Sequence, residues 1–489
     1  MANIQRNLEP SGDLFHFTQP LDHFNTSVNS TWEQRYQVND YEYRKGGPFF
    51  VLISGEGEID EGWLKYGQMY QNAKIYGALM FQLEHRFYGQ SHPTSDASIE
   101  SLRYLSSLQA LADLDAFISG MKTKFNRPDA KVVVFGGSYS GNLVVWYRSL
   151  YPNSTVGGVA SSAPVLAEVD FIEYVETVGN AQKYFDPNCY DAVNAAIKAV
   201  QDLVAARNDK KLNSFFGLCG SKISFDDPYQ IEMFYDAITS PWMGATQYNG
   251  VGSSSQLASY CRQMTRTDVN TPLEKYAQWY NQTKSTQEPC VDVDYKAVIE
   301  FIKQDSWSSA SVAGGTRQWL WQTCAEFAYY QSMDSSNQPF GFGTVDIKYL
   351  ENLYCIQPFG ITSLDVTRSV VLTNQKYGGK SPNATRVFLL NGSIDPWHPL
   401  GIYDRDLDKE SPSRYIEGTS HCYDMHEALP NDPPELTQAR KDVTAKLSEW
   451  LEMPVSAAMN LKAFRYPVVA LVLIGIWCMC CPLLENRAW

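Results

Sequence analysis

The sequence predicts an α/β fold, in which a parallel β-sheet carries helices on both of its faces. Two observations support this prediction. Short, continuously apolar segments alternate with segments of helical periodicity, and unbroken apolar strands are typical of parallel sheets that are buried on both faces. The alternation stops near residue 168 and resumes near residue 386, so an insertion is expected to interrupt the fold.

The first part of the sheet is expected between residues 48 and 160. Apolar runs predict strands at 48–54, 77–83, 132–135 and 157–160. Helical periodicity predicts helices in the intervals, at 63–73, 105–117 and 142–150. Pro152 follows the last of these helices and ends it.

The C-terminal part of the chain is expected to complete the sheet. It contains predicted strands at 386–391 and 413–416 and a closing helix at 435–451. Amphipathic helices with Trp, Tyr and Gln predominate in the insertion. The predicted segments are an N-terminal segment packing on the core (1–47), the first part of the core (48–167), a helical cap domain with disulfides (168–350), the second part of the core (351–452) and a C-terminal apolar segment (466–484).

The composition excludes several classes of protein. Of the 489 residues, 44% are hydrophobic and 19% are charged, which is typical of globular and not of disordered chains. The net charge is −14 and no stretch is rich in Lys and Arg, so no nucleic-acid partner is expected. No Cys-x-x-Cys pair is present, and the sequence predicts neither a metal site nor a cofactor.

The stretch VVVFGGSYSGNLVVWY (132–147) places Ser138 between a predicted strand and a predicted helix. This is the context of the Gly-x-Ser-x-Gly nucleophile elbow, whose sharp turn needs small residues. Gly136 matches the first glycine, whereas Ser140 occupies the position of the second and Gly141 follows it. The same motif centred on Ser140 instead of Ser138 fits the sequence less well. Taken alone, the stretch also agrees with a glycine turn that contains an incidental serine.

A serine nucleophile needs an acid and a base, and hydrolases of this kind carry them in the order Ser, Asp or Glu, His. Three of the seven histidines follow Ser138, namely His398, His421 and His426. Asp395 and His421 each follow a predicted strand. His398 shares the loop of Asp395, and His426 is expected to be structural. The sequence therefore predicts Ser138 as nucleophile, Asp395 as acid and His421 as base.

Other candidate site residues lie at strand ends. The oxyanion hole is expected from the backbone N–H groups of Tyr139 and of Gly55 or its neighbour Glu56. Trp397 is expected either to line a proline-sized pocket or to pack in the core. The charged run 84–86 (EHR) favours a structural ion-pair cluster over a catalytic role.

These motifs together resemble the S28 family of serine peptidases. The matching segments are LDHFN (21–25), QRYQVND (34–40), ISGEGE (53–58), EHRFYGQS (84–91), GGSYSGNLVVWYR (136–148), SSAPV (161–165), NGSIDPWHP (391–399) and GTSHCYDM (418–425). The resemblance implies an α/β-hydrolase core with an inserted, mainly helical (SKS-like) cap domain. It implies cleavage next to proline near a peptide terminus, usually at acidic pH. It also assigns Ser138, Asp395 and His421 the roles given above.

Six cysteines lie in or next to the predicted insertion, between residues 189 and 355. Their connectivity cannot be chosen from the sequence alone. The resemblance implies the pairs Cys189–Cys355, Cys219–Cys290 and Cys261–Cys324. Cys422, next to His421, would then lie outside the three pairs.

Dispersed cysteines and six Asn-x-Ser/Thr sequons together predict passage through the secretory pathway. Asn391 lies in the Asp395 loop and is not expected to be modified. The N-terminus shows no apolar signal region, so either the chain is truncated or misannotated or the predicted compartment is wrong, and we favour truncation. Glycosylation is expected at Asn25, Asn29, Asn153, Asn281 and Asn383.

The uncharged segment 466–484 is long enough to span a bilayer and is a candidate membrane tether. A GPI-anchor signal and a buried C-terminal helix are the alternatives. The expected location is a lysosome-like or vacuole-like compartment or the extracellular space, with or without this anchor.

We interpret the chain as a serine exopeptidase that acts on proline-containing peptides. Two alternatives are a lipase or esterase on the same fold and a non-catalytic, membrane-tethered binding homologue. The sequence leaves open whether the enzyme is a carboxypeptidase or a dipeptidyl peptidase. A homodimer is a further expectation.

Overall fold

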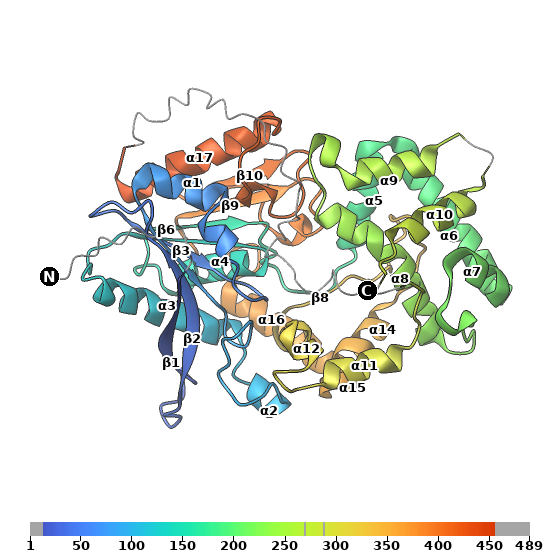
Figure 1. Cartoon of the computed structure of the whole chain (residues 1–489), viewed down its shortest axis with the longest axis horizontal. Coiled ribbons are helices and arrows are strands. Elements are labelled where there is room, and N and C mark those ends of the chain that lie inside the picture. Colours follow the sequence, from blue (N-terminus) through green and yellow to red (C-terminus); the bar gives the residue numbers. More distant parts are fainter. Residues whose placement is uncertain (1–12, 268–269, 287–288, 455–489) are drawn as a thin grey trace.

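The computed structural model describes residues 13–267, 270–286 and 289–454. They form an eight-stranded sheet with the order β1-β2-β4-β3-β5-β6-β9-β10 (Figure 1). The six strands from β4 to β10 in this order run parallel to one another. The strands are β1 (Asp13–Pro20), β2 (Thr31–Asn39), β3 (Phe49–Ile53), β4 (Leu79–Leu83), β5 (Val132–Gly137), β6 (Gly157–Ser161), β9 (Val387–Gly392) and β10 (Ser413–Ile416).

Each of the six predicted strands is present in the parallel part of the sheet. Five of them, β3, β4, β5, β6 and β9, are buried at every position, which explains why their sequences are mainly apolar or small. The strand order, the helices on both faces and the helical insertion after β6 make this an α/β-hydrolase fold, as the resemblance implies.

Strands β1 and β2 correct the expectation of an all-parallel sheet. They pair antiparallel with each other, and β2 pairs antiparallel with β4, so residues 13–39 extend the sheet. Polar side chains are buried here: the side chain of Gln34 donates to the Glu84 carbonyl at 2.7 Å and accepts from Gln19 at 2.7 Å. Buried glutamines give no apolar pattern, so the sequence indicates only a segment that packs on the core.

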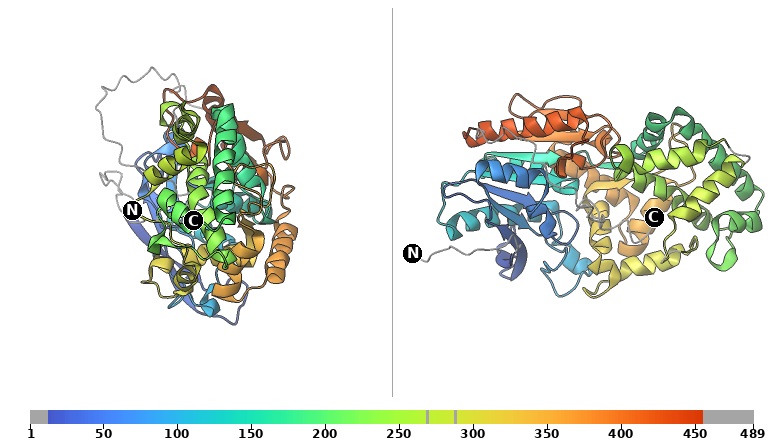
Figure 2. Two further views of the ribbon diagram at one scale, coloured as in Figure 1. Left: turned by 90° about the vertical axis from the view of Figure 1, so that its right-hand side faces the viewer. Right: turned by 45° about the horizontal axis from the view of Figure 1, so that its top comes forward.

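Helices cover both faces of the sheet (Figure 1, Figure 2). One face carries α1 (Gly67–Tyr76) and α17 (Pro434–Leu451). The other face carries α3 (Ser107–Lys124), α4 (Tyr139–Leu150) and α16 (Ser363–Tyr377). The last two helices are held together by the stacked rings of Trp146 and Tyr377, whose centroids lie 4.1 Å apart.

The chain between β6 and α16 is mainly helical and lies to one side of the sheet, as Figure 2 shows. It also contains a short parallel pair of strands, β7 (Glu168–Asp170) and β8 (Ala328–Tyr330). The domain boundaries at residues 168 and 350 stay predictions. The longer helices are α5 (Glu173–Phe185), α6 (Pro187–Ala205), α7 (Asp209–Phe216), α8 (Pro228–Gln247), α9 (Gln256–Thr265), α10 (Pro272–Thr283) and α11 (Tyr295–Lys303).

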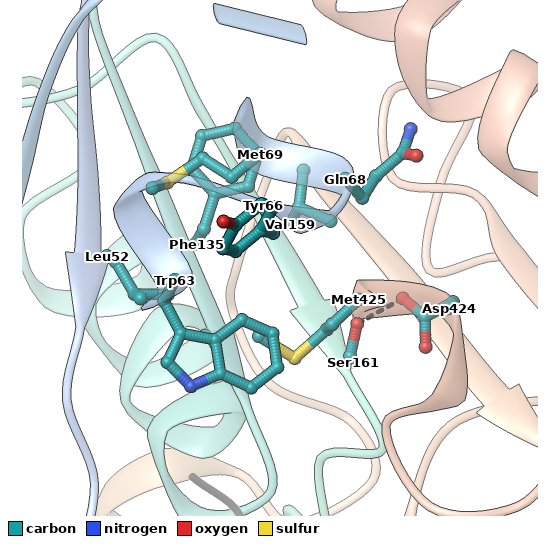
Figure 3. Close-up of a pocket in the computed structure, with 11 residues that line it drawn as sticks. Leu52, Trp63, Tyr66, Gln68, Met69, Phe135, Val159, Ser161, Asp424 and Met425 are labelled. Carbon is teal, nitrogen blue, oxygen red and sulfur yellow. Dashed lines mark hydrogen bonds between the residues drawn. The ribbon is translucent and has the colours of Figure 1, made fainter. Parts of the chain in front are cut away.

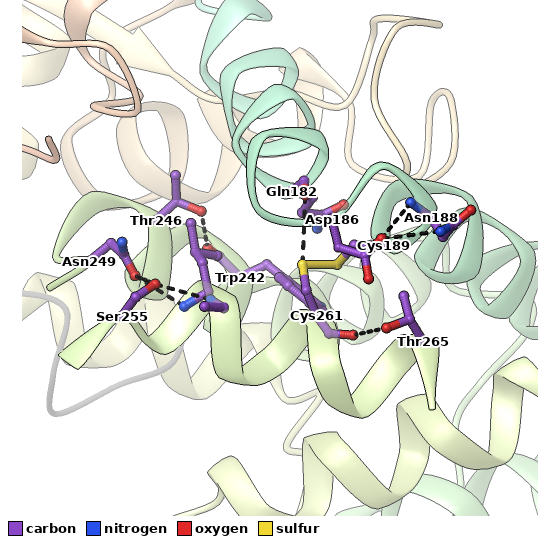
Figure 4. The surroundings of a disulfide bond; sticks show 12 residues. Gln182, Asp186, Asn188, Cys189, Trp242, Thr246, Asn249, Ser255, Cys261 and Thr265 are labelled. Atoms are coloured by element: carbon purple, nitrogen blue, oxygen red, sulfur yellow. Dashed lines mark hydrogen bonds between the residues drawn. A yellow bond between two sulfur atoms is a disulfide. The ribbon is translucent and has the colours of Figure 1, made fainter. Parts of the chain in front are cut away.

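Three disulfides cross-link the insertion, and two of the three expected pairs are wrong. The bonds join Cys189 to Cys261, Cys219 to Cys290 and Cys324 to Cys355, so only Cys219–Cys290 matches the expectation. The pairs Cys189–Cys355 and Cys261–Cys324 do not form because α6, which carries Cys189, packs against α9, which carries Cys261 (Figure 4). Helix packing, and not the order of the cysteines, decides the pairing. Buried Cys422 lies outside the three bonds.

The predicted membrane span, residues 466–484, lies outside the described residues. None of the helices in the described part of the chain is long and apolar enough to cross a bilayer. The last of them, α17, is amphipathic and buries Leu436, Val443 and Leu447 against the sheet.

Candidate active site

Ser138 lies at the sharp turn between β5 and α4. Its φ of 57° and ψ of −131° are strained for a residue with a side chain, and its N–H donates to the Ser161 carbonyl at 2.9 Å. Glycines permit the turn: a Cβ on Gly136 would lie 2.3 Å from the Ser140 carbonyl oxygen, and one on Gly141 would lie 2.8 Å from that of Ser161. The segment therefore has the geometry of a nucleophile elbow.

His421 and Asp395 form a hydrogen-bonded pair beyond the ends of neighbouring strands β10 and β9. His421 Nδ1 lies 2.8 Å from Asp395 Oδ1, and both side chains are fully buried. Burial disfavours a charged imidazole, but the Asp395 carboxylate and the neighbouring Cys422 together outweigh burial and raise the pKa of His421 well above its usual value. His421 Nε2 is buried and has no hydrogen-bond partner among the described residues, Ser138 included, so its role as the base stays a prediction.

The two other downstream histidines have different surroundings. His398 Nδ1 bonds to the backbone carbonyl of Asp395 at 2.7 Å and not to its carboxylate. His426 packs against Trp63 and Tyr423, with ring centroids 5.6 and 5.7 Å from its own. The Asp395 carboxylate is therefore hydrogen-bonded to His421 and not to His398.

Both residues predicted for the oxyanion hole lie beside the elbow. Tyr139 is the first residue of α4, where the N–H groups of a helix lack intrahelical partners. Gly55 follows β3, and a Cβ built on it would lie 3.8 Å from the Ser140 Cβ atom. Two backbone donors at such positions suit a developing oxyanion, and this role stays a prediction.

Trp397 lies in the Asp395 loop, and its side chain is partly exposed. The rings of Phe171, Tyr174 and Tyr329 surround it, with centroids 5.6, 5.5 and 5.5 Å from its own. The His421 ring lies 6.3 Å away. Trp397 thus belongs to an aromatic wall next to His421 and is not a fully buried core residue.

Gln247, at the end of α8, is a residue of this site that the sequence does not reveal. Its side-chain oxygen accepts from Trp397 Nε1 at 3.0 Å and from the Tyr174 hydroxyl at 2.8 Å. Its backbone carbonyl accepts from the His421 N–H at 3.1 Å. The helical insertion therefore holds both the acid loop and the histidine loop. No local motif marks this glutamine, because the two loops that it contacts lie 150 residues or more along the chain.

The charged run 84–86 forms ion pairs, in agreement with the interpretation that the sequence favours. Arg86 pairs with Asp113 at 2.6 Å, and both side chains are fully buried. Glu84 pairs with Arg35 at 2.6 Å. Burial lowers the pKa of His85 to about 4, so this imidazole is neutral at physiological pH.

A small, mainly apolar cavity lies behind the elbow, on the α1 side of the sheet (Figure 3). Leu52, Trp63, Met69 and Phe135 contribute to its walls. None of the three predicted triad residues lines this cavity. It is therefore separate from the place where a substrate would meet Ser138.

Known proteins match this chain over most of its length. The family model described as "Serine carboxypeptidase S28" matches residues 19–443, which include every strand from β2 to β10. A Caenorhabditis elegans protein named as a serine protease is 40% identical over 452 residues, covering 89% of this chain and 87% of that protein. The thymus-specific serine protease of Mus musculus is 34% identical over 458 residues, covering 89% of this chain and 86% of that protein. The lysosomal Pro-X carboxypeptidase of Homo sapiens is 26% identical over 461 residues, covering 90% of this chain and 88% of that protein. The chain belongs to the S28 family of serine peptidases.

Proposed function

We propose that the chain is a serine exopeptidase that hydrolyses peptide bonds next to proline near a peptide terminus, with Ser138, Asp395 and His421 as its triad. The observation that carries this proposal is the buried 2.8 Å contact between His421 and Asp395. A carboxylate on Nδ1 holds the tautomer in which Nε2 acts as the base. The histidine loop also packs against the elbow, since the Cys422 sulfur would lie 2.9 Å from a Cβ on Gly137.

The proposed reaction proceeds through an acyl-enzyme. Ser138 Oγ attacks the scissile carbonyl carbon while His421 Nε2 takes the hydroxyl proton, and Asp395 stabilises the resulting imidazolium. The N–H groups of Tyr139 and Gly55 donate to the oxyanion. His421 then protonates the leaving amine. Water, activated by the same histidine, attacks the acyl-enzyme and releases the second product.

The aromatic wall at Trp397 supports a preference for proline. A pyrrolidine ring is apolar and rigid, so it packs on an aromatic surface with little loss of conformational freedom. Trp397 is partly exposed and lies close to His421, where the residue next to the scissile bond would be bound. The name of the human relative, lysosomal Pro-X carboxypeptidase, also supports a preference for proline.

We further propose that the chain works in an oxidising compartment, either lysosome-like or extracellular. Three disulfides are typical of such compartments. Asn391 is buried, whereas the asparagines of the other sequons are exposed. A membrane tether through residues 466–484 and a homodimer stay predictions. The exposed sequon asparagines are Asn25, Asn29, Asn153, Asn281 and Asn383.

The proposal is tested with purified wild-type protein and Ser138→Ala on one peptide that carries proline second from each end. Mass spectrometry of the products shows which end is cleaved, and so separates a carboxypeptidase from a dipeptidyl peptidase. Wild type should cleave and Ser138→Ala should not, with both equally folded. Equal turnover by the variant would exclude Ser138. Activity on short acyl esters alone would favour an esterase, and wild type that a fluorophosphonate does not label would favour a binding protein.

A further inference from the structure

The two serines at the end of β6, in the motif SSAPV, contact the loops of both predicted reacting groups. The Ser161 carbonyl accepts from the Ser138 N–H at 2.9 Å, and the Ser161 hydroxyl donates to the Asp424 carboxylate (Figure 3). The Ser162 hydroxyl accepts from the N–H of Cys422, the residue after His421, at 2.8 Å. One end of one strand therefore holds the nucleophile loop and the histidine loop together.

The backbone at Ser162 is strained. Its φ of 47° lies in the left-handed region, where glycine is favoured because it lacks a Cβ atom. Its N–H donates to the Leu390 carbonyl of β9 at 2.7 Å, which keeps the turn in place. A serine at such a position indicates a use for its side chain, and the hydroxyl has one, because it is the acceptor for the Cys422 amide.

That contact is buried and has a counterpart on the other side of the histidine loop. Ser162 and Cys422 are 1% and 0% exposed, so without the hydroxyl the Cys422 N–H would lose its acceptor away from bulk water. From the opposite side, Gln247 accepts from the His421 N–H at 3.1 Å. The histidine loop is thus held between the helical insertion and the end of β6.

We propose that Ser162 is a positioning residue, whose hydroxyl sets the placement of His421 relative to Ser138 through the Cys422 amide. This inference rests on the proposed triad. A displacement of about 1 Å between a nucleophile and its base costs roughly 100-fold in rate, while binding of the peptide is little affected. The Ser162 hydroxyl should therefore act on kcat and not on KM.

The test compares Ser162→Gly with Ser162→Thr. Glycine removes the acceptor but relieves the backbone, so we expect kcat and the rate of fluorophosphonate labelling to fall about 10- to 100-fold, with KM and Tm close to wild type. Threonine keeps the hydroxyl but is β-branched, so we expect Tm to fall while kcat is largely retained. Ser221→Gly is the matched control, because Ser221 has a φ of 61° and is exposed on the insertion. Glycine relieves the same kind of backbone strain there, so kcat and the labelling rate should not change and Tm should not fall.

Two results would overturn the inference. Ser162→Gly with wild-type kcat and labelling rate would show that the hydroxyl is not needed. Parallel losses of Tm and kcat in both variants would indicate a structural role alone. Wild-type protein that resists fluorophosphonate would instead contradict the proposed function, so the two failures are distinguishable.

Discussion

The side chain of Ser140 is hydrogen-bonded to the backbone of Gly137 on the other side of the nucleophile. The Ser140 hydroxyl accepts from the Gly137 N–H at 3.0 Å and donates to the Gly137 carbonyl at 2.8 Å. The serine that departs from the Gly-x-Ser-x-Gly pattern therefore closes the turn around Ser138. Its side chain is used within the elbow and does not crowd it.

Ser140→Ala should weaken the elbow. The Gly137 N–H is buried, and its loss of an acceptor should destabilise the fold by about 1–3 kcal/mol. Chemical denaturation measures this difference, and kcat should fall with it because the turn that holds Ser138 loosens. Ser149→Ala in the same helix is the control, because the Ser149 hydroxyl has no hydrogen-bond partner among the described residues. Unchanged stability of Ser140→Ala would show that these two bonds contribute little.

Asp395→Asn should lower kcat by about 10³- to 10⁴-fold, because an amide does not hold the His421 tautomer that a base requires. His421 must be neutral to accept a proton, so wild-type activity is lost as the pH falls through its raised pKa. That decline should therefore begin nearer neutral pH than for an ordinary histidine, whereas the family resemblance implies an acidic optimum. In Asp395→Asn the remaining activity should extend to lower pH. A pH profile of kcat/KM with the same acid limb in both proteins would contradict this pairing.

Trp397→Ala should reduce kcat/KM for proline peptides by roughly 10- to 100-fold, because an apolar wall of the proposed subsite is lost. Trp397→Phe keeps an aromatic face and should retain more activity. Hydrolysis of a small acyl ester serves as the reference, since it does not need a proline pocket. An equal loss on peptide and ester would mean that Trp397 supports the Asp395 loop and not the substrate.

The disulfide connectivity can be checked by mapping peptides without reduction. Fragments containing Cys189 and Cys261 should be linked, and so should those containing Cys324 and Cys355. Recovery of a Cys189–Cys355 peptide would instead support the order implied by the family resemblance. Replacing the Cys189 and Cys261 pair by alanines should cost about 4 kcal/mol of unfolding free energy, because that bond closes a loop of 72 residues.

The insertion should be more stable at acidic than at alkaline pH. Burial raises the pKa of Asp236 and of Glu232 to about 7, above the value near 4 of an unfolded carboxyl. The folded state then binds more protons, so stability is fully present below pH 4 and declines as the pH rises through 7. Tm should therefore be higher at pH 5 than at pH 8. Asp236→Asn should reduce this slope, whereas Asp191→Asn at an exposed site should leave it unchanged.

Much of the core and the triad candidates could be predicted because their signals are local. Five of the six parallel strands are fully buried, and most of them are apolar runs in the sequence, as Val132–Gly137 is. The loops that leave such strands on the same edge of the sheet converge, so Ser138, Asp395 and His421 could be selected by their places after strands. The structure places Asp395 and His421 in contact, as this reasoning predicts, although they lie 26 residues apart in the sequence.

Tertiary packing decided what no local pattern encodes. Strand β2 buries glutamines, whose hydrogen-bond partners become visible only in the folded sheet. Cys189 pairs with Cys261 because α6 packs on α9, and the order of cysteines carries no information on helix packing. Gln247 reaches Trp397 across 150 residues, and Ser162 reaches Cys422 across 260. The sequence by itself determined which chemistry the strand ends can carry, whereas contacts between distant segments determined what holds that chemistry in place.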